Sequence, residues 1–150
     1  MVDRATRGAA ALSLGAAVAL VGTFLPWLRS GARDRSSYSI FDLVERLGFA
    51  PDGFVAWSLR LWPLVPLLLV GTTVAAWAVV TRHLDWRVAV VADAVAVAWV
   101  GTTAVALLFA PDAGLFRVGS GPTVTVVGIV LAASGGVWIR PRRSPASGAA

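Results

Sequence analysis

The sequence of 150 residues contains no cysteine, and it also contains no lysine, asparagine or glutamine. Without cysteine the chain has no disulfide bond, no thiolate nucleophile and no Cys-ligated metal. His83 is the single histidine, so no Ser/His/Asp set can be assembled without it, and with Asp85 it is short of ligands for a metal. The sequence also contains no phosphate-binding loop and no dinucleotide fingerprint. It therefore predicts no catalytic residues, no metal and no cofactor, and hence no enzyme.

Charge is scarce as well, since only 14% of the residues are charged, against about 25% in a typical soluble domain. Hydrophobic residues make up 57% of the chain, and the mean hydropathy is +0.77. A chain this short leaves much of its surface exposed, so a soluble domain would have nowhere to bury so much apolar surface. This composition excludes an ordinary soluble domain and a disordered chain. The 13 basic residues are arginines scattered between apolar runs, which fits phospholipid headgroup contacts better than nucleic-acid binding.

Four apolar stretches are long enough to cross a bilayer, which takes about 20 residues of helix. They span residues 8–28, 61–81, 88–109 and 122–139. The first is too long for the apolar core of a cleaved signal peptide. We therefore expect an all-α membrane protein, with a four-helix transmembrane bundle in residues 1–139. Residues 140–150, rich in Pro, Ser and Ala, are expected to form a disordered cytoplasmic tail.

The placement of arginine predicts the orientation of the four spans. An even number of spans puts both termini on one side, together with the short Arg82–Arg87 hairpin and the three arginines of the tail. The positive-inside rule then places both termini in the cytoplasm and the protein in the inner (plasma) membrane of a bacterium. Tryptophans at the ends of spans are expected at the headgroup level. They are Trp27, Trp62, Trp86 and Trp138.

The loop at residues 29–60 is the only segment long enough to fold outside the bilayer. Ser39 resembles a helix cap, and Ile40, Phe41, Val44 and Leu47 recur at helical spacing. We expect a short amphipathic helix that ends near residue 48 and is followed by a turn at residues 51–53. Such a helix either lies on the membrane and caps the bundle or docks a partner protein.

A basic, hydroxyl-rich stretch begins this loop, with Arg29, Arg33 and Arg35 among serines. Arginine binds phosphate bidentately, so these three residues are candidates for binding a lipid headgroup or an anionic polymer of the envelope. The alternative is a solvated loop in which an arginine pairs with Asp34.

Small residues recur at helix-packing intervals inside the first and fourth spans. Glycines 8, 15 and 22 repeat every seven residues, and Gly128, Ala132 and Gly136 repeat every four. This spacing predicts close approach of helix backbones. The sequence Val-Gly-Thr-Thr occurs at residues 70–73 and again at 100–103, where the Thr hydroxyls can bond back to their own helices.

Asp93 is the one acid well inside a predicted span. An ionisable group in the membrane is a functional hypothesis by default, because burying its charge costs at least about 2.5–3.5 kcal/mol. Asp93 either carries a proton or cation, or it is a paired or protonated residue that locks the bundle.

Several short segments of the chain are similar to segments of a known group of proteins. They are residues 24–28 (FLPWL), 30–31 (SG), 35–38 (RSSY), 47–49 (LGF) and 62–66 (WPLVP). In these the chain resembles a group of small, uncharacterised four-span membrane proteins of actinobacteria. The resemblance covers the first half of the chain, and it implies a cell-membrane location and no particular reaction.

The sequence is compatible with two functions. One is a non-enzymatic interaction or accessory subunit that contacts the lipid bilayer and a larger membrane complex. The other is a small homo-oligomeric transporter or channel that uses Asp93.

Overall fold

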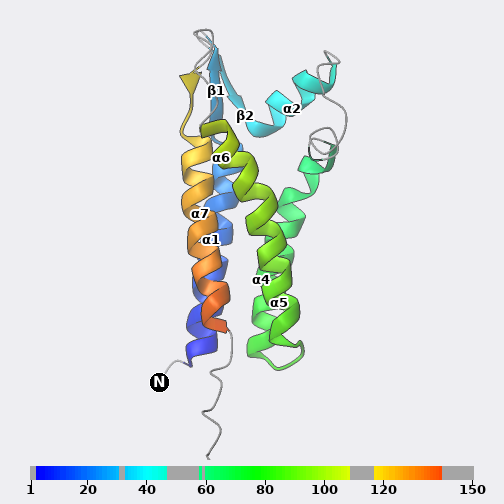
Figure 1. The fold of residues 1–150 in the computed structure, drawn as a ribbon, viewed down its shortest axis with the longest axis vertical. Helices are drawn as coiled ribbons and strands as arrows, with labels where there is room; N and C mark the ends of the chain where they lie inside the picture. Colours follow the sequence, from blue (N-terminus) through cyan, green and yellow to red (C-terminus); the bar gives the residue numbers. More distant parts are fainter. Residues whose placement is uncertain (1–2, 31–32, 47–57, 59, 109–116, 140–150) are drawn as a thin grey trace, which may run out of the picture.

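Four helical spans run side by side, and a small sheet with one short helix stands at one end of them (Figure 1). The computed structural model describes residues 3–30, 33–46, 58, 60–108 and 117–139. The spans are α1 (Arg4–Phe24), η1 (Trp62–Leu64) with α4 (Val65–Val80), α5 (Trp86–Ala96) with η2 (Val97–Gly101) and α6 (Thr102–Leu108), and α7 (Gly121–Ile139). Each is long and apolar enough to cross a membrane, so the four predicted apolar helices are confirmed, with ends shifted by a few residues.

The first span ends earlier than predicted. Helix α1 stops at Phe24, and Leu25 is already extended with ψ of 164°. The cause is Pro26, because a proline ring clashes with a helical conformation of the residue before it. The predicted end at residue 28 therefore falls inside a strand.

The predicted all-α fold is confirmed in part, because the protein is mostly helical but also contains a small sheet. A three-stranded antiparallel sheet consists of β1 (Pro26–Ser30), β2 (Arg33–Ser36) and β3 (Arg117–Val118), in the order β2-β1-β3. Strands β1 and β2 form a hairpin, whereas β3 comes from the segment just before α7. The sheet therefore ties the end of α1 to the start of α7.

The predicted amphipathic helix is present as α2 (Ser37–Arg46). It begins two residues before the expected cap, since Ser39 donates to the carbonyl of Ser36 at 2.9 Å instead of starting the helix. Ile40 is buried, whereas Asp42 and Arg46 are exposed and form an ion pair at 3.0 Å. The expected stop at residue 48 and the turn at 51–53 lie outside the described residues, as does the expected tail at 140–150.

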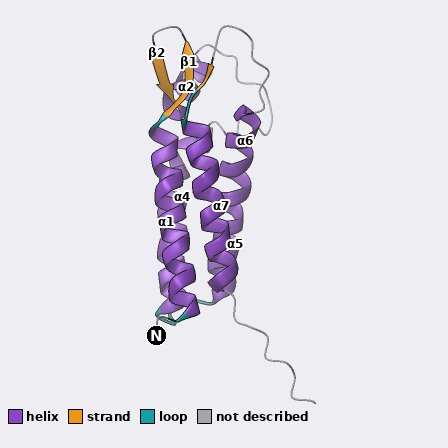
Figure 2. Cartoon of the chain, turned by 90° about the vertical axis from the view of Figure 1, so that its left-hand side faces the viewer, coloured by secondary structure: helices purple, strands orange, loops and turns teal. Residues whose placement is uncertain are grey.

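Helices α1 and α7 lie side by side and are the most closely packed pair of helices in the bundle (Figure 2). In α1 and in α7, 44% of the most apolar window is buried, against 22% and 28% in the second and third spans. Glycines allow this contact, because a Cβ at Gly8 would lie 2.9 Å from the carbonyl oxygen of Gly135. The predicted close approach of small residues is confirmed, and it leaves no room for a pore between these two helices.

Helices α4 and α5 form an antiparallel helical hairpin. Their turn lies at the same end of the bundle as the start of α1 and the end of α7, opposite the sheet (Figure 1). Arg82 has φ of 62°, and His83 N–H donates to the carbonyl of Ala78 at 2.8 Å, which closes α4 with a left-handed cap. Asp85 then caps α5 by accepting from Arg87 N–H at 3.0 Å.

The repeated Val-Gly-Thr-Thr segments have different backbones. Residues 70–73 lie in regular α-helix, whereas Val100 and Gly101 belong to the π-helical η2. The predicted back-bonding of threonine is confirmed in both copies, since Thr73 donates to Leu69 O at 3.1 Å and Thr103 donates to Trp99 O at 2.9 Å.

Candidate functional site

Asp93 lies in the second turn of α5 and is only 6% exposed. Its carboxylate packs on Gly136 of α7, where a Cβ would come within 3.2 Å of Asp93 Cγ and closer still to Oδ2. The side chain therefore faces another helix of the bundle and not the lipid. Gly136, which sequence reasoning placed only in a small-residue stripe, is the residue that makes room for the acid.

Asp93 forms neither an ion pair nor a hydrogen bond with any residue in the described part of the chain. Arg87, the arginine closest to Asp93 in the sequence, lies with its guanidinium 5.9 Å from the centroid of the Trp86 ring, in a cation–π contact. Arg82 is exposed in the turn. The described residues contain no group of three or more potential metal ligands, and Asp93 is a single buried carboxyl.

The basic stretch forms part of the sheet at the opposite end of the bundle. Arg29 on β1 donates to Asp34 on β2 through Nε at 2.7 Å and through Nη2 at 3.2 Å. The register also pairs Arg29 with Arg117 on β3. Because side chains alternate between the two faces of a strand, Arg33 and Arg35 point to the opposite face. The structure thus groups Arg29 with Arg117, and it separates Arg29 from the other two candidates.

A cluster of four aromatic residues lies beneath the sheet and α2. It consists of Trp27 on β1, Phe41 on α2, Trp62 on η1 and Trp99 on η2. Ring centroids are 4.7 Å apart for Phe41 and Trp62, and 5.4 Å apart for Trp27 and Trp62. All four contacts are edge-on, a favourable arrangement of aromatic rings.

The two tryptophans that end the first span and begin the second do not contact headgroups, which corrects the prediction. Trp27 is fully buried and Trp62 is 1% exposed. Trp27 Nε1 donates to the carbonyl of Gly22 at 2.9 Å, and Trp62 Nε1 donates to Ser37 Oγ at 3.0 Å. Their positions in the sequence fit a headgroup belt equally well, so only the packing reveals them as core residues.

Ser37 connects this cluster to α1. Its hydroxyl, fully buried, accepts from Trp62 and donates to the carbonyl of Thr23 at 2.7 Å. Sequence reasoning treated Ser37 as part of a hydrophilic stretch and missed this role, because its two partners are distant from it in sequence.

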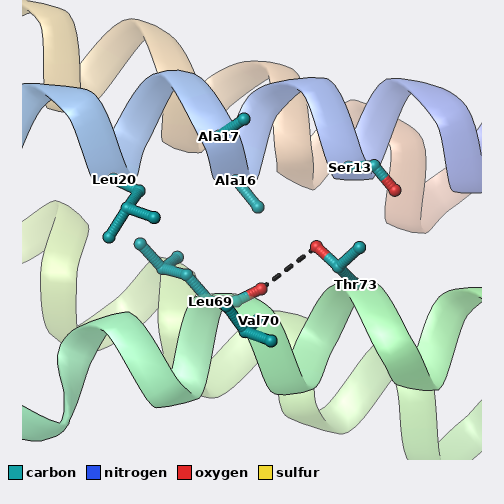
Figure 3. A pocket seen from close by; sticks show the side chains of 7 residues that line it. All are labelled: Ser13, Ala16, Ala17, Leu20, Leu69, Val70 and Thr73. Atoms are coloured by element: carbon teal, nitrogen blue, oxygen red, sulfur yellow. Dashed lines mark hydrogen bonds between the residues drawn. The ribbon is translucent and has the colours of Figure 1, made fainter.

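An open apolar groove of about 190 Å³ runs between α1 and α4 (Figure 3). Its lining residues are Ser13, Ala16, Ala17, Leu20, Leu69, Val70 and Thr73. The two hydroxyls are already engaged, since Ser13 donates to Ala9 O at 2.8 Å and Thr73 donates to Leu69 O at 3.1 Å. The groove therefore offers mainly methyl and methylene surface, as a lipid chain requires.

These features define a mostly helical protein with four helices long and apolar enough to cross a membrane and a small folded cap. Comparison of the chain with protein-family models, with curated proteins and with solved structures finds no match.

Proposed function

We propose that this chain is a non-enzymatic multi-pass membrane protein of the bacterial cell envelope that serves as an interaction or accessory subunit. We call the three-stranded sheet together with α2 the cap. The observation that carries the proposal is that the cap is packed firmly onto the helices beneath it. A surface that recognises a partner needs side chains held in a fixed geometry by the structure beneath them.

The aromatic cluster provides that fixed geometry. Trp27 and Phe41 come from the cap, and they pack on Trp62 and Trp99 from the two spans below. The hydrogen bonds of Ser37 join α2 to both α1 and η1. A merely solvated loop would not require such a buried foundation, whereas a recognition surface gains from it.

We place the protein in the plasma membrane with both termini in the cytoplasm and the cap outside. This orientation is supported by the arginines at the end opposite the cap, which lie close to span ends where the positive-inside rule operates. Of the described residues, Arg4 and Arg7 stand in the first turn of α1, and Arg82 and Arg87 stand in the α4–α5 turn and at the start of α5.

Cross-linking from the cap tests the interaction proposal. A photoreactive amino acid at Asp42, exposed on α2, should capture one larger membrane protein in stoichiometric yield after extraction in a mild detergent. The matched control is Leu67, which is 68% exposed on α4 and expected to face lipid. Capture from Asp42 but not from Leu67 is the expected result, and mass spectrometry identifies the partner. If the residue at Asp42 captures no partner protein and no second copy of the chain, the proposal is contradicted.

A second candidate function is a small oligomeric transporter or channel that uses Asp93. It is supported by the burial of this carboxyl beside Gly136 without a bonding partner among the described residues, since intramembrane acids commonly mark proton or ion pathways. In reconstituted vesicles, this function requires a proton or cation flux that Asp93→Asn abolishes while the protein stays folded. Wild-type vesicles without any flux would exclude it.

A further inference from the structure

We infer that Arg29 and Arg117 form a clamp for a phosphate oxyanion on the exposed face of the cap sheet. The two residues are direct partners in the register of β1 and β3. Side chains at directly opposed positions have Cβ atoms about 4.5–5.5 Å apart. Two guanidinium groups at that spacing can both reach the oxygens of one tetrahedral anion.

The pairing of two arginines is unfavourable unless something lies between them. Like charges directly opposite each other on adjacent strands destabilise a sheet. Asp34 compensates one of them, because it pairs with Arg29 across the β1–β2 hairpin. Arg117 is exposed and forms no ion pair with the residues that the structure describes. The row of three side chains across the sheet thus has a net charge of +1, which one bound oxyanion neutralises.

Asp34 also orients Arg29 for such a ligand. It accepts from Nε and Nη2 of the guanidinium, and this leaves Nη1 available to another acceptor. A guanidinium that is already held in place loses less conformational freedom when it binds, and Arg suits phosphate because its donors are arranged in a planar fork.

The position of the clamp defines two sources of this phosphate chemistry. Strand β1 continues outward from the end of α1 in both views (Figures 1 and 2). The five residues that follow Phe24, from Leu25 to Arg29, cover up to about 16 Å at the rise of a strand. The headgroup layer adds only about 5–8 Å to each side of the hydrocarbon core. Arg29 and Arg117 therefore lie in or just beyond that layer, within reach of a lipid phosphate and of a phosphate from solution or from a wall polymer.

The experiment measures phosphate binding to the purified chain in a phosphorus-free maltoside detergent, followed by the ³¹P line width of inorganic phosphate. A second arm measures retention of phosphatidylglycerol by protein in nanodiscs of mixed phosphatidylcholine and phosphatidylglycerol. Saturable binding in the first arm identifies soluble phosphate as a sufficient ligand, and selective retention only in the second identifies the lipid headgroup. No binding in either arm overturns the clamp.

Arg117→Gln should weaken binding at least tenfold in whichever arm shows it, which corresponds to about 1.4 kcal/mol. Arg33→Gln is the matched control, since it removes the same charge from the same sheet but on the opposite face. An equal loss in the control would mean a general charge effect and would overturn the clamp. If Arg117→Gln disturbs the far-UV circular dichroism, Arg117→Lys replaces it, with an expected loss of at least threefold because the charge stays and the planar fork is lost.

The clamp is independent of the proposed interaction with a membrane partner. Cross-linking from Asp42 on α2 does not require phosphate, so either result can fail while the other stands.

Discussion

Gly15 of α1 and Gly128 of α7 each occupy the space that a side chain of the other would need. A Cβ at Gly15 would lie 2.6 Å from the carbonyl oxygen of Gly128, and a Cβ at Gly128 would lie 2.7 Å from the carbonyl oxygen of Gly15. Both obstacles are backbone atoms, so no rotamer change relieves the clash. The contact between the two most buried helices therefore depends on this pair.

Gly15→Ala should lower the free energy of unfolding by about 1–3 kcal/mol, the usual cost of overpacking. Gly71→Ala is the control, because a Cβ there meets nothing within 4 Å, and alanine in an exposed helix is favoured over glycine by about 0.5–1 kcal/mol. Unfolding in mixed micelles with increasing dodecyl sulfate, followed by circular dichroism, measures both. Equal effects of the two substitutions would contradict the packing described for α1 and α7.

Ser37→Ala should release the cap from the bundle. The change removes the acceptor of the Trp62 indole N–H and the donor to the Thr23 carbonyl, both in a buried setting, and each unsatisfied buried group costs about 1–3 kcal/mol. The near-ultraviolet circular dichroism of the tryptophans should weaken at the same time. Ser134→Ala is the control, because this exposed serine bonds only to Leu131 O of its own helix. It should alter stability by no more than about 0.5 kcal/mol, and a larger effect than that of Ser37→Ala would refute the anchoring role.

Hydropathy predicted the four helices because the hydropathy of a segment depends only on its own residues, about 20 in each helix. The sheet escaped prediction because β3 is two residues long and pairs with β1 some 90 positions earlier in the chain. No periodicity within a strand that short distinguishes it from a turn. The early end of α1 could have been predicted from the sequence, because Pro26 disfavours a helical conformation of the residue before it.

The candidate residues themselves could be predicted from local sequence, but the residues that contact them from distant parts of the chain could not. Asp93 stands out as a lone acid in an apolar run, but its neighbour Gly136 is 43 positions away and known only from the packing. Arg29 was singled out by its local charge, whereas its partner Arg117 depends on the pairing of β1 with β3. Trp62 looked like an interface residue until its ring was found against Trp27 and Phe41.

Arg82→Gly should stabilise the protein by about 1 kcal/mol. Arg82 has φ of 62°, a conformation that costs an L-residue roughly 1–2 kcal/mol and costs glycine almost nothing. Arg87→Gly removes the same charge at the same end of the bundle but lies inside α5, so it should destabilise by about 1 kcal/mol. Opposite signs in chemical unfolding are the expected result. If both substitutions lower the free energy of unfolding, the interactions of the Arg82 side chain stabilise the protein by more than its backbone strain destabilises it.

The absence of cysteine allows the orientation to be tested with single-cysteine variants. Arg33→Cys reports the cap and His83→Cys reports the α4–α5 turn, since both positions are exposed. Ser37 is unsuitable because it is fully buried. An impermeant thiol reagent should label intact cells at Arg33→Cys only, and His83→Cys should react after the cells are opened. The reverse pattern would place the termini outside.

Asp93 and Gly136 should show strong energetic coupling. Gly136→Ala places a methyl group against the Asp93 carboxylate, and we expect it to destabilise the bundle by about 1–3 kcal/mol. In an Asp93→Ala background the obstacle is gone, so the same change should cost much less, with an interaction energy of at least about 1 kcal/mol for residues in direct contact. Gly71→Ala in the same background provides the control and should be additive, because nothing lies within 4 Å of its Cβ. If Gly136→Ala were also additive, Asp93 would not rest against α7 in the folded protein, and the carboxyl would be free to face lipid or a second copy of the chain.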